Sequence, residues 1–269
     1  MNAAVRTPRN VPALLNALYD AGHDGTVLVT GAPGGRIHLR KGLVIAVDTP
    51  GAPSVESVLL KSGRVEDEPW TAACAACDGR EGRLGDELEA RGLLGRAEFE
   101  IVCTAAVFDA AFALTLGPPG DWEVADVTAA PVSGPGFAPR RLAAETNRRL
   151  ALIDRMWGPP AEFARTRIRP AAALPVHVPP RYAALLRVIN GRRTPRDVAF
   201  AVGRGTYAVM LDLAQMHELG LVRPEVPGTA GRPSTAPRLP GDRTVPPPEA
   251  VQLPRRRPGA HPLHREDGA

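Results

Sequence analysis

Alternating polar and apolar positions predict a small antiparallel sheet near the start of the chain. Residues 36–40 alternate with the two-residue period of a half-buried strand, and residues 43–47 form an apolar, β-branched run. Lys41 and Gly42 lie between these two strands, where a tight hairpin turn would reverse the chain. A glycine-rich turn would join the hairpin to an earlier strand at residues 26–30.

The pattern after this hairpin is mostly helical. Ser54 is a suitable N-cap for a short helix, and residues 65–116 contain three further segments with apolar positions three and four residues apart. Residues 121–127 alternate again and would join the sheet as an edge or third strand. Residues 140–157 form an amphipathic helix with a basic outer face. These elements predict an α+β fold in which a small antiparallel sheet packs with several helices.

Prolines are concentrated between residues 158 and 180, which predicts a linker between two modules. Residues 181–224 then have the pattern of three short helices with an extended end. Thr194 would cap the second of these helices, and Thr206 would cap the third. Residues 225–269 are rich in proline and arginine and poor in large apolar side chains, so we expect a disordered tail there.

The first module resembles a known family. Its pattern G-x-I-x-L-x-x-G-x-V-x-A at residues 35–46, the following SGRV, and GRLGDELEARGLLGRAEFE at residues 82–100 resemble the PATAN family of bacterial domains. The similarity extends through DWEVADV and covers residues 10–157, so residues 1–157 are assigned as a PATAN-like domain. The resemblance implies a signalling or adaptor role in bacteria, coupled to response regulators or small GTPase systems, without an established catalytic residue.

The second module, in NGRRTPRDVAFAVGRGTYAVMLDLAQMHELGLV at residues 190–222, resembles a winged-helix or helix-turn-helix module. That resemblance implies a third helix that lies in the DNA major groove. However, Asp212 and Glu218 would face phosphate there, and Arg204 is the sole arginine beside the helix, so we favour protein docking over DNA binding. The candidate nucleic-acid contacts are Arg192, Arg193, Arg196, Arg204, Thr206, Tyr207 and Gln215.

Composition indicates a mostly globular chain that stays in the cytoplasm. Its 269 residues are 44% hydrophobic, which is enough to bury a core. Its net charge of +4 is not by itself a nucleic-acid footprint and leaves contact with nucleic acid open. Residues 1–10 are polar and lack the features of an export signal. The longest weakly polar stretch, residues 101–116, is interrupted by Thr104 and Asp109, so we expect no membrane insertion.

Motifs for catalysis, metals and cofactors are weak. Cys74 and Cys77 form a C-x-x-C pair to which Cys103 could add a third ligand, but no second pair or nearby histidine completes a zinc site. GAPGGR at residues 31–36 lacks the Lys and Ser or Thr of a nucleotide-binding loop and continues into a strand. The six histidines are scattered and lie beside no nucleophile signature. We therefore predict no metal, no cofactor and no enzymatic activity.

The sequence thus predicts a non-enzymatic signalling or adaptor protein that acts through protein–protein contacts. Its partner would be a protein of a bacterial signalling system. The predicted docking surface is the hairpin with its neighbouring helix, and its named residues are Arg36, His38, Arg40 and Lys41. The alternative is a transcriptional regulator that binds DNA through the helix-turn-helix-like segment 192–222, with a homodimer as one arrangement.

Overall fold

The computed structural model describes residues 10–77, 82–126, 130, 132, 134–173 and 178–225. The described residues belong to one compact unit. The tail predicted for residues 225–269 lies, from residue 226 onwards, outside the described residues.

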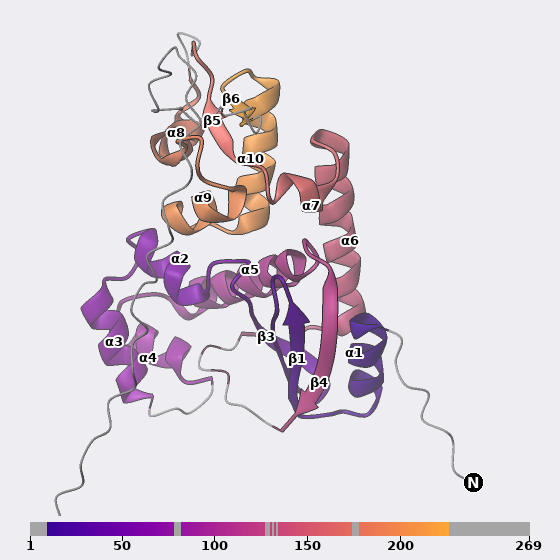
Figure 1. Ribbon diagram of the computed structural model, residues 1–269. Helices are drawn as coiled ribbons and strands as arrows, with labels where there is room; N and C mark the ends of the chain where they lie inside the picture. The colour runs from indigo at the N-terminus through magenta and orange to yellow at the C-terminus, as the bar shows by residue number, and fades with distance from the viewer. Residues whose placement is uncertain are drawn as a thin grey trace, which may run out of the picture. The chain divides into compact units, whose positions relative to one another are not determined.

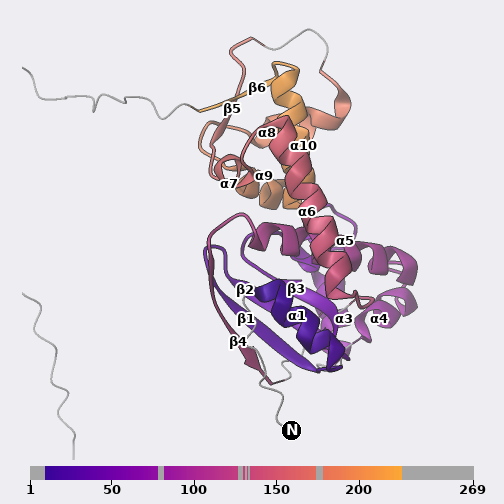
Figure 2. The same ribbon diagram turned by 90° about the vertical axis from the view of Figure 1, so that its right-hand side faces the viewer.

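The predicted antiparallel sheet is present, and it has four strands in the order β3-β2-β1-β4 (Figure 2). Lys41 and Gly42 form the hairpin turn between β2 and β3, and both have a positive φ, as a two-residue turn of this kind requires. The strand predicted at residues 121–127 pairs with β1 and is an edge strand. The strands are β1 (Gly25–Gly31), β2 (Gly35–Arg40), β3 (Leu43–Asp48) and β4 (Pro119–Ala125).

Three helices pack on one face of the sheet: α1 (Val11–Asp20), α5 (Arg96–Leu114) and α6 (Pro139–Met156) (Figures 1 and 2). The alternating apolar residues Ile37 and Leu39 of β2 are buried in the same hydrophobic cluster as side chains from these helices. The two-residue period of the strands therefore selects the sheet face that meets the helices.

A second cluster lies against α5 and contains three short helices, α2 (Val55–Lys61), α3 (Asp67–Ala76) and α4 (Leu84–Ala90). Ser54 caps α2 as predicted, because its Oγ accepts a hydrogen bond from the backbone N–H of Ser57 at 3.1 Å. This cap fixes the start of α2 directly after the loop that follows β3.

The C-terminal elements form a third cluster, which also includes Phe112 and Leu116 from the region of α5. The segment predicted as a linker contributes to this core, because Phe163 and Ile168 are fully buried and β5 pairs with β6. The elements are α7 (Pro160–Phe163), β5 (Ile168–Pro170), the 3-10 turn η1 (Pro180–Tyr182), α8 (Ala183–Val188), α9 (Pro195–Val202), α10 (Thr206–Glu218) and β6 (Val222–Pro224).

The predicted cap of α9 is confirmed, and that of α10 is wrong. Thr194 and Asp197 form a reciprocal capping box at the start of α9. At α10 the N-cap position is Gly205, and the Thr206 hydroxyl donates to the carbonyl oxygen of Gly51 at 3.0 Å instead of capping the helix. A carboxylate from α5 satisfies the first amides of α10.

No helix in the described part of the chain combines the length and the apolar character that are needed to cross a bilayer.

Candidate functional site

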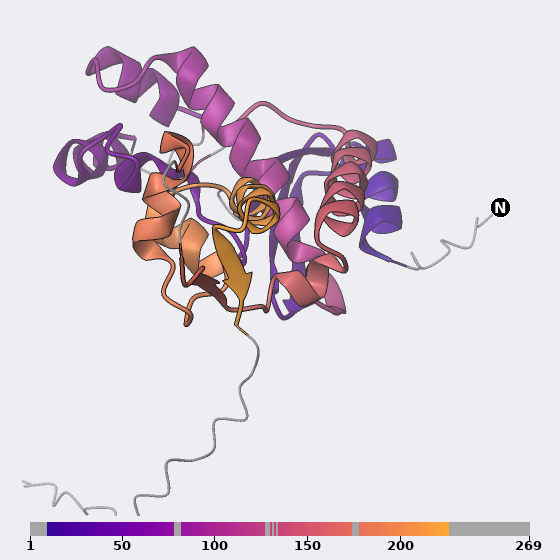
Figure 3. The ribbon, with the colours of Figure 1, turned by 90° about the horizontal axis from the view of Figure 1, so that it is seen from above.

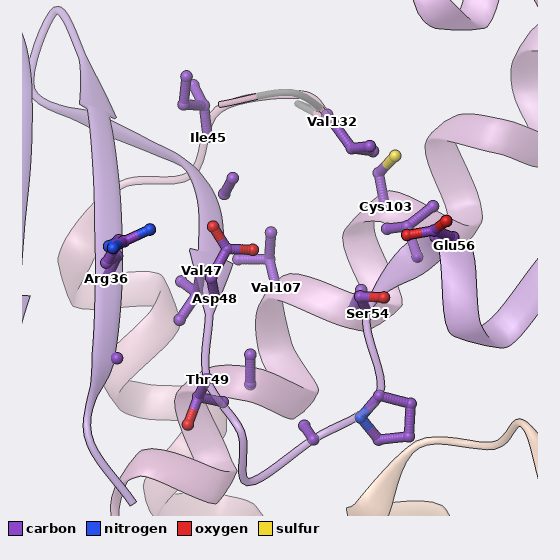
Figure 4. A pocket seen from close by; sticks show the side chains of 18 of the residues that line it. Arg36, Ile45, Val47, Asp48, Thr49, Ser54, Glu56, Cys103, Val107 and Val132 are labelled. Atoms are coloured by element: carbon purple, nitrogen blue, oxygen red, sulfur yellow. The ribbon is translucent and has the colours of Figure 1, made fainter. Parts of the chain in front are cut away.

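A groove of about 510 Å³ lies between the edge strand β3 and the helices α2 and α5 (Figure 4). Its walls are mostly apolar, with Ile45 and Val47 on the sheet side and Val55, Ala106 and Val107 on the helix side. The volume is in the range of sites that hold small molecules or a few side chains. The groove is thus a candidate binding site.

Described residues outside the sheet cover the outer edge of β3 along its first part. Val44 exchanges two backbone hydrogen bonds with Phe137, both 2.9 Å long, and the carbonyl oxygen of Ile45 accepts from the N–H of Gly134. Beyond Ile45, no described residue outside the sheet forms a backbone hydrogen bond with the rest of the strand. The groove therefore begins where this cover ends.

The loop between β3 and α2 forms the end of the groove and is held by its own hydrogen bonds. The Thr49 hydroxyl donates to the carbonyl oxygen of Gly34 at 2.8 Å, and it accepts from the N–H of Gly51 at 3.1 Å. Ser54 then caps α2. These bonds predict that the groove keeps its shape when it is empty.

The ionisable groups of the groove lie at its margins. Asp48 lies on the sheet side and Glu56 on the helix side (Figure 4). Arg36 is the cross-strand partner of Asp48, so these two opposite charges offset one another in part. Glu56 is exposed and forms no ion pair with any described residue. The helix side of the groove is therefore its net acidic side.

Asp48 is the outer end of a chain of three polar side chains that the sequence did not suggest. The Asp48 carboxylate lies 3.0 Å from Nε2 of His38, and Nδ1 of His38 lies 3.2 Å from the Thr26 hydroxyl. The order resembles that of a nucleophile triad, but Thr26 is 0% exposed, so no substrate reaches its hydroxyl. We assign these contacts to satisfying buried polar groups.

The structure separates the four residues of the predicted docking surface. Arg36 lines the groove, whereas Arg40 and Lys41 are exposed at the opposite, hairpin end of β2. His38 is 3% exposed and cannot contact a partner, so this part of the prediction is wrong. The outward face of the strand is also covered near His38, where Ile45, Ala46 and Ala130 form a small buried cluster.

The three cysteines lie in the cluster of α2, α3 and α4, and none is activated. Burial raises the pKa of the Cys103 thiol to about 12, and burial also raises the pKa of Cys74 and of Cys77. These thiols are neutral and weakly nucleophilic at neutral pH. The described residues contain no group of three or more His, Cys, Asp or Glu side chains that could hold a metal ion.

The start of α10, where a helix-turn-helix protein would contact DNA bases, is bound to the N-terminal part of the chain. The carboxylate of Asp109 on α5 accepts from the N–H of Thr206 at 2.7 Å and from the N–H of Tyr207 at 2.8 Å. Asp109 is 5% exposed, and this burial raises its pKa, while the two backbone hydrogen bonds lower it. Figure 3 shows α10 almost end-on above α5.

Most other residues of the predicted nucleic-acid surface are also engaged. Arg204 forms an ion pair with Asp212, and Gln215 accepts a hydrogen bond from the Tyr182 hydroxyl. Thr206 is buried, and the half-buried Tyr207 ring packs edge-on against Phe112. Arg193 and Arg196 donate to the carbonyl oxygens of Val188 and Pro50, and Arg192 is exposed.

The chain matches no protein-family model, no curated protein and no solved structure. The resemblance of residues 10–157 to the PATAN family therefore stays a prediction.

Asp109 is a buried structural residue whose role the sequence patterns did not predict. It follows Ala106 by three residues and precedes Ala113 by four, so it lies on the apolar face of the α5 pattern. A carboxylate on such a face signals a buried partner. Its partners are 97 and 98 residues away in sequence, and no local pattern identifies them.

Proposed function

We propose that this protein is a non-enzymatic adaptor that binds an extended segment of a partner protein in the groove beside β3. The observation that carries this proposal is the position of the groove, which begins where the cover of the edge strand by described residues ends. An extended peptide can add to such an edge through main-chain hydrogen bonds while its alternate side chains enter the groove. In keeping with the PATAN resemblance, we expect a partner from a bacterial signalling system in the cytoplasm.

The chemistry of the groove defines the partner segment. Apolar walls at Val47, Val55 and Val107 favour alternate aliphatic or aromatic side chains. Glu56 lies without an ionic partner among the described residues on the helix side, which favours a Lys or Arg in the segment. We therefore expect an extended segment with apolar residues at every second position and one basic residue that faces Glu56.

The packing of α10 supports an adaptor over the alternative of a DNA-binding regulator. Base readout by a helix-turn-helix protein needs the N-terminal residues of the recognition helix to enter the major groove. Here Asp109 binds the first two amides of that helix, and Thr206 is buried. Of the candidate DNA contacts, Arg192 and Arg196 are exposed without an ion pair to any described residue, but they would contribute only phosphate contacts.

Peptide selection followed by affinity measurement tests the proposal. A displayed library of random peptides is selected on the full chain, and enriched peptides are labelled for fluorescence anisotropy. Ala106→Trp would fill the groove from its helix wall, so we expect at least a tenfold loss of affinity. The control is Ala105→Trp, because Ala105 is exposed on the same helix and does not line the groove.

Glu56→Lys separates the electrostatic part of the proposal from its apolar part. It reverses the charge on the helix side, so peptides with an acidic residue should replace those with a basic one. The adaptor proposal fails if no peptide is enriched, or if Ala106→Trp and Ala105→Trp bind enriched peptides as tightly as the unaltered protein does.

The DNA alternative is tested by anisotropy of the full chain with random and genomic duplexes at low and near-physiological salt. We expect no sequence-selective binding, and any binding at low salt should weaken steeply as salt rises. Sequence-selective binding that persists at near-physiological salt would contradict the adaptor assignment and favour the DNA-binding regulator.

A further inference from the structure

A second cavity, of about 390 Å³, lies between the glycine-rich loop that joins β1 to β2 and the elements α7, α9 and α10. Its lining includes Gly31 at the end of β1, residues 32–34 of the following loop, the loop residue Gly51, Arg165 two residues after α7, and Arg196 of α9. It shares with the groove a single described lining residue, Pro50. The cavity is therefore a separate candidate site.

The charges of this cavity are unbalanced. Arg165 and Arg196 are its ionisable lining residues, and no Asp or Glu lines it within the part of the chain that is described. Neither arginine forms an ion pair with a described residue, whereas nearby Arg169 and Arg204 are paired with Glu225 and Asp212. Two positive charges thus face one cavity without compensation.

Arg196 is held in place by contacts that leave part of its guanidinium available. Its Nε donates to the carbonyl oxygen of Pro50 at 2.6 Å, and the guanidinium lies over the Phe200 ring, 5.4 Å from its centre. The two Nη groups form no hydrogen bond with any residue that the structure describes. A donor that is already oriented loses less entropy when it binds an anion.

We propose that this cavity binds a phosphorylated small molecule, with a phosphoryl group between Arg165 and Arg196. Guanidinium groups match the geometry of phosphate oxygens and can bind them through paired N–H donors. A phosphate dianion balances both positive charges, whereas a single carboxylate would leave one of them uncompensated.

Such a ligand would bridge segments that are far apart in sequence. Gly31–Gly34 and Pro50 belong to loops of the sheet, whereas Arg165 and Arg196 belong to the C-terminal elements. Because the ligand binds only the arrangement in which these segments are together, it should raise the melting temperature, and above its Kd the rise should grow with the logarithm of its concentration. This behaviour is independent of partner binding in the groove.

Calorimetric titration of the full chain with inorganic tripolyphosphate and with ATP, both in the presence of EDTA, tests the proposal. The double variant Arg165→Ala/Arg196→Ala should bind at least tenfold more weakly. The matched control is Arg155→Ala/Arg192→Ala, which removes the same charge from exposed positions outside the cavity and should bind within twofold of the unaltered protein.

Each outcome has a defined meaning. Tighter binding of ATP than of tripolyphosphate assigns the site to a nucleotide, and equal binding assigns it to phosphoryl groups alone; both results support the proposal. Absence of binding by both probes overturns it, as does equal binding by the two double variants. If the cavity double variant does not fold, Arg165→Ala alone decides, because its side chain has no hydrogen bond or ion pair with a described residue.

Discussion

Replacement of Asp109 by alanine should destabilise the protein through the start of α10. The substitution removes the acceptor of two hydrogen bonds, which are 2.7 and 2.8 Å long, and leaves the backbone N–H groups of Thr206 and Tyr207 without it. Thr206 is 1% exposed, so water does not readily replace the carboxylate there. The loss therefore combines a missing helix cap with buried, unsatisfied donors.

The expected magnitude follows from these two contributions. Two unsatisfied buried donors would cost about 2–6 kcal/mol, at about 1–3 kcal/mol each. Alanine also relieves the cost of keeping a carboxylate in a site where burial raises its pKa, and this relief offsets part of the loss. A lost N-cap by itself costs about 0.5–2 kcal/mol. Because this range and the larger cost of two unsatisfied donors bracket the loss, we expect a net destabilisation of about 2–3 kcal/mol.

Urea unfolding of the full chain, followed by circular dichroism, measures this change. The control is Asp67→Ala, since Asp67 lies exposed in the first turn of α3 and forms no ion pair with a described residue. This control should lose less than about 0.5 kcal/mol. Hydrogen exchange locates the effect, because the amides of Thr206 and Tyr207 should lose protection first. Equal unfolding free energies for the two variants, with unchanged exchange at α10, would refute the reasoning.

The pH dependence of the same site gives a second measurement. Burial raises the pKa of Asp109 above its ordinary value of 3.8, so the folded state holds this proton more tightly than the unfolded state does. The stability that this tighter proton binding adds to the folded state is fully present below pH 3.8. It is lost as pH rises through the pKa that Asp109 has in the folded protein. Asp109→Asn mimics the protonated carboxyl, so this variant does not lose that stability as pH rises. The difference in unfolding free energy between the unaltered protein and Asp109→Asn should therefore shrink as pH rises from 3.8 through the pKa of Asp109 in the folded protein.

Two further substitutions test the packing and the charge network. Gly203→Ala should cost about 2–3 kcal/mol of stability, because Gly203 has a φ of +64° and an added Cβ would collide with Lys61. The control Gly220→Ala, at a φ of +70° with open space around it, should cost only about 1 kcal/mol. Equal losses of stability in urea unfolding would contradict this reasoning. Glu145→Gln should cost about 1 kcal/mol at pH 7, because the hydrogen bond from Arg148 lowers the pKa of Glu145 to about 2. The stability that the Glu145 carboxylate contributes is present above pH 4.5 and is lost as pH falls towards 2. The unfolding free energies of Glu145→Gln and of the unaltered protein should therefore become equal in acid. A difference between them that does not change with pH would contradict this expectation.

Local sequence patterns determined the elements of this protein and several of their ends. The two-residue period of β2 and the turn at Lys41 and Gly42 predicted the hairpin, and Ser54 and Thr194 predicted the starts of α2 and α9. These features depend on residues only a few positions apart. Periodicity and side-chain capping act over that range, so the sequence alone was enough.

Tertiary structure decided what these elements face. Asp109 took the place that Thr206 was expected to fill as the cap of α10, and Phe163 was buried within a stretch whose prolines suggested a linker. His38 was on the polar side of its strand and was still buried. In each case the deciding partner lies far away in sequence or on a second packed face. A periodic pattern identifies one buried face of a helix or strand. It contains no information on which distant residue covers the opposite face of that element.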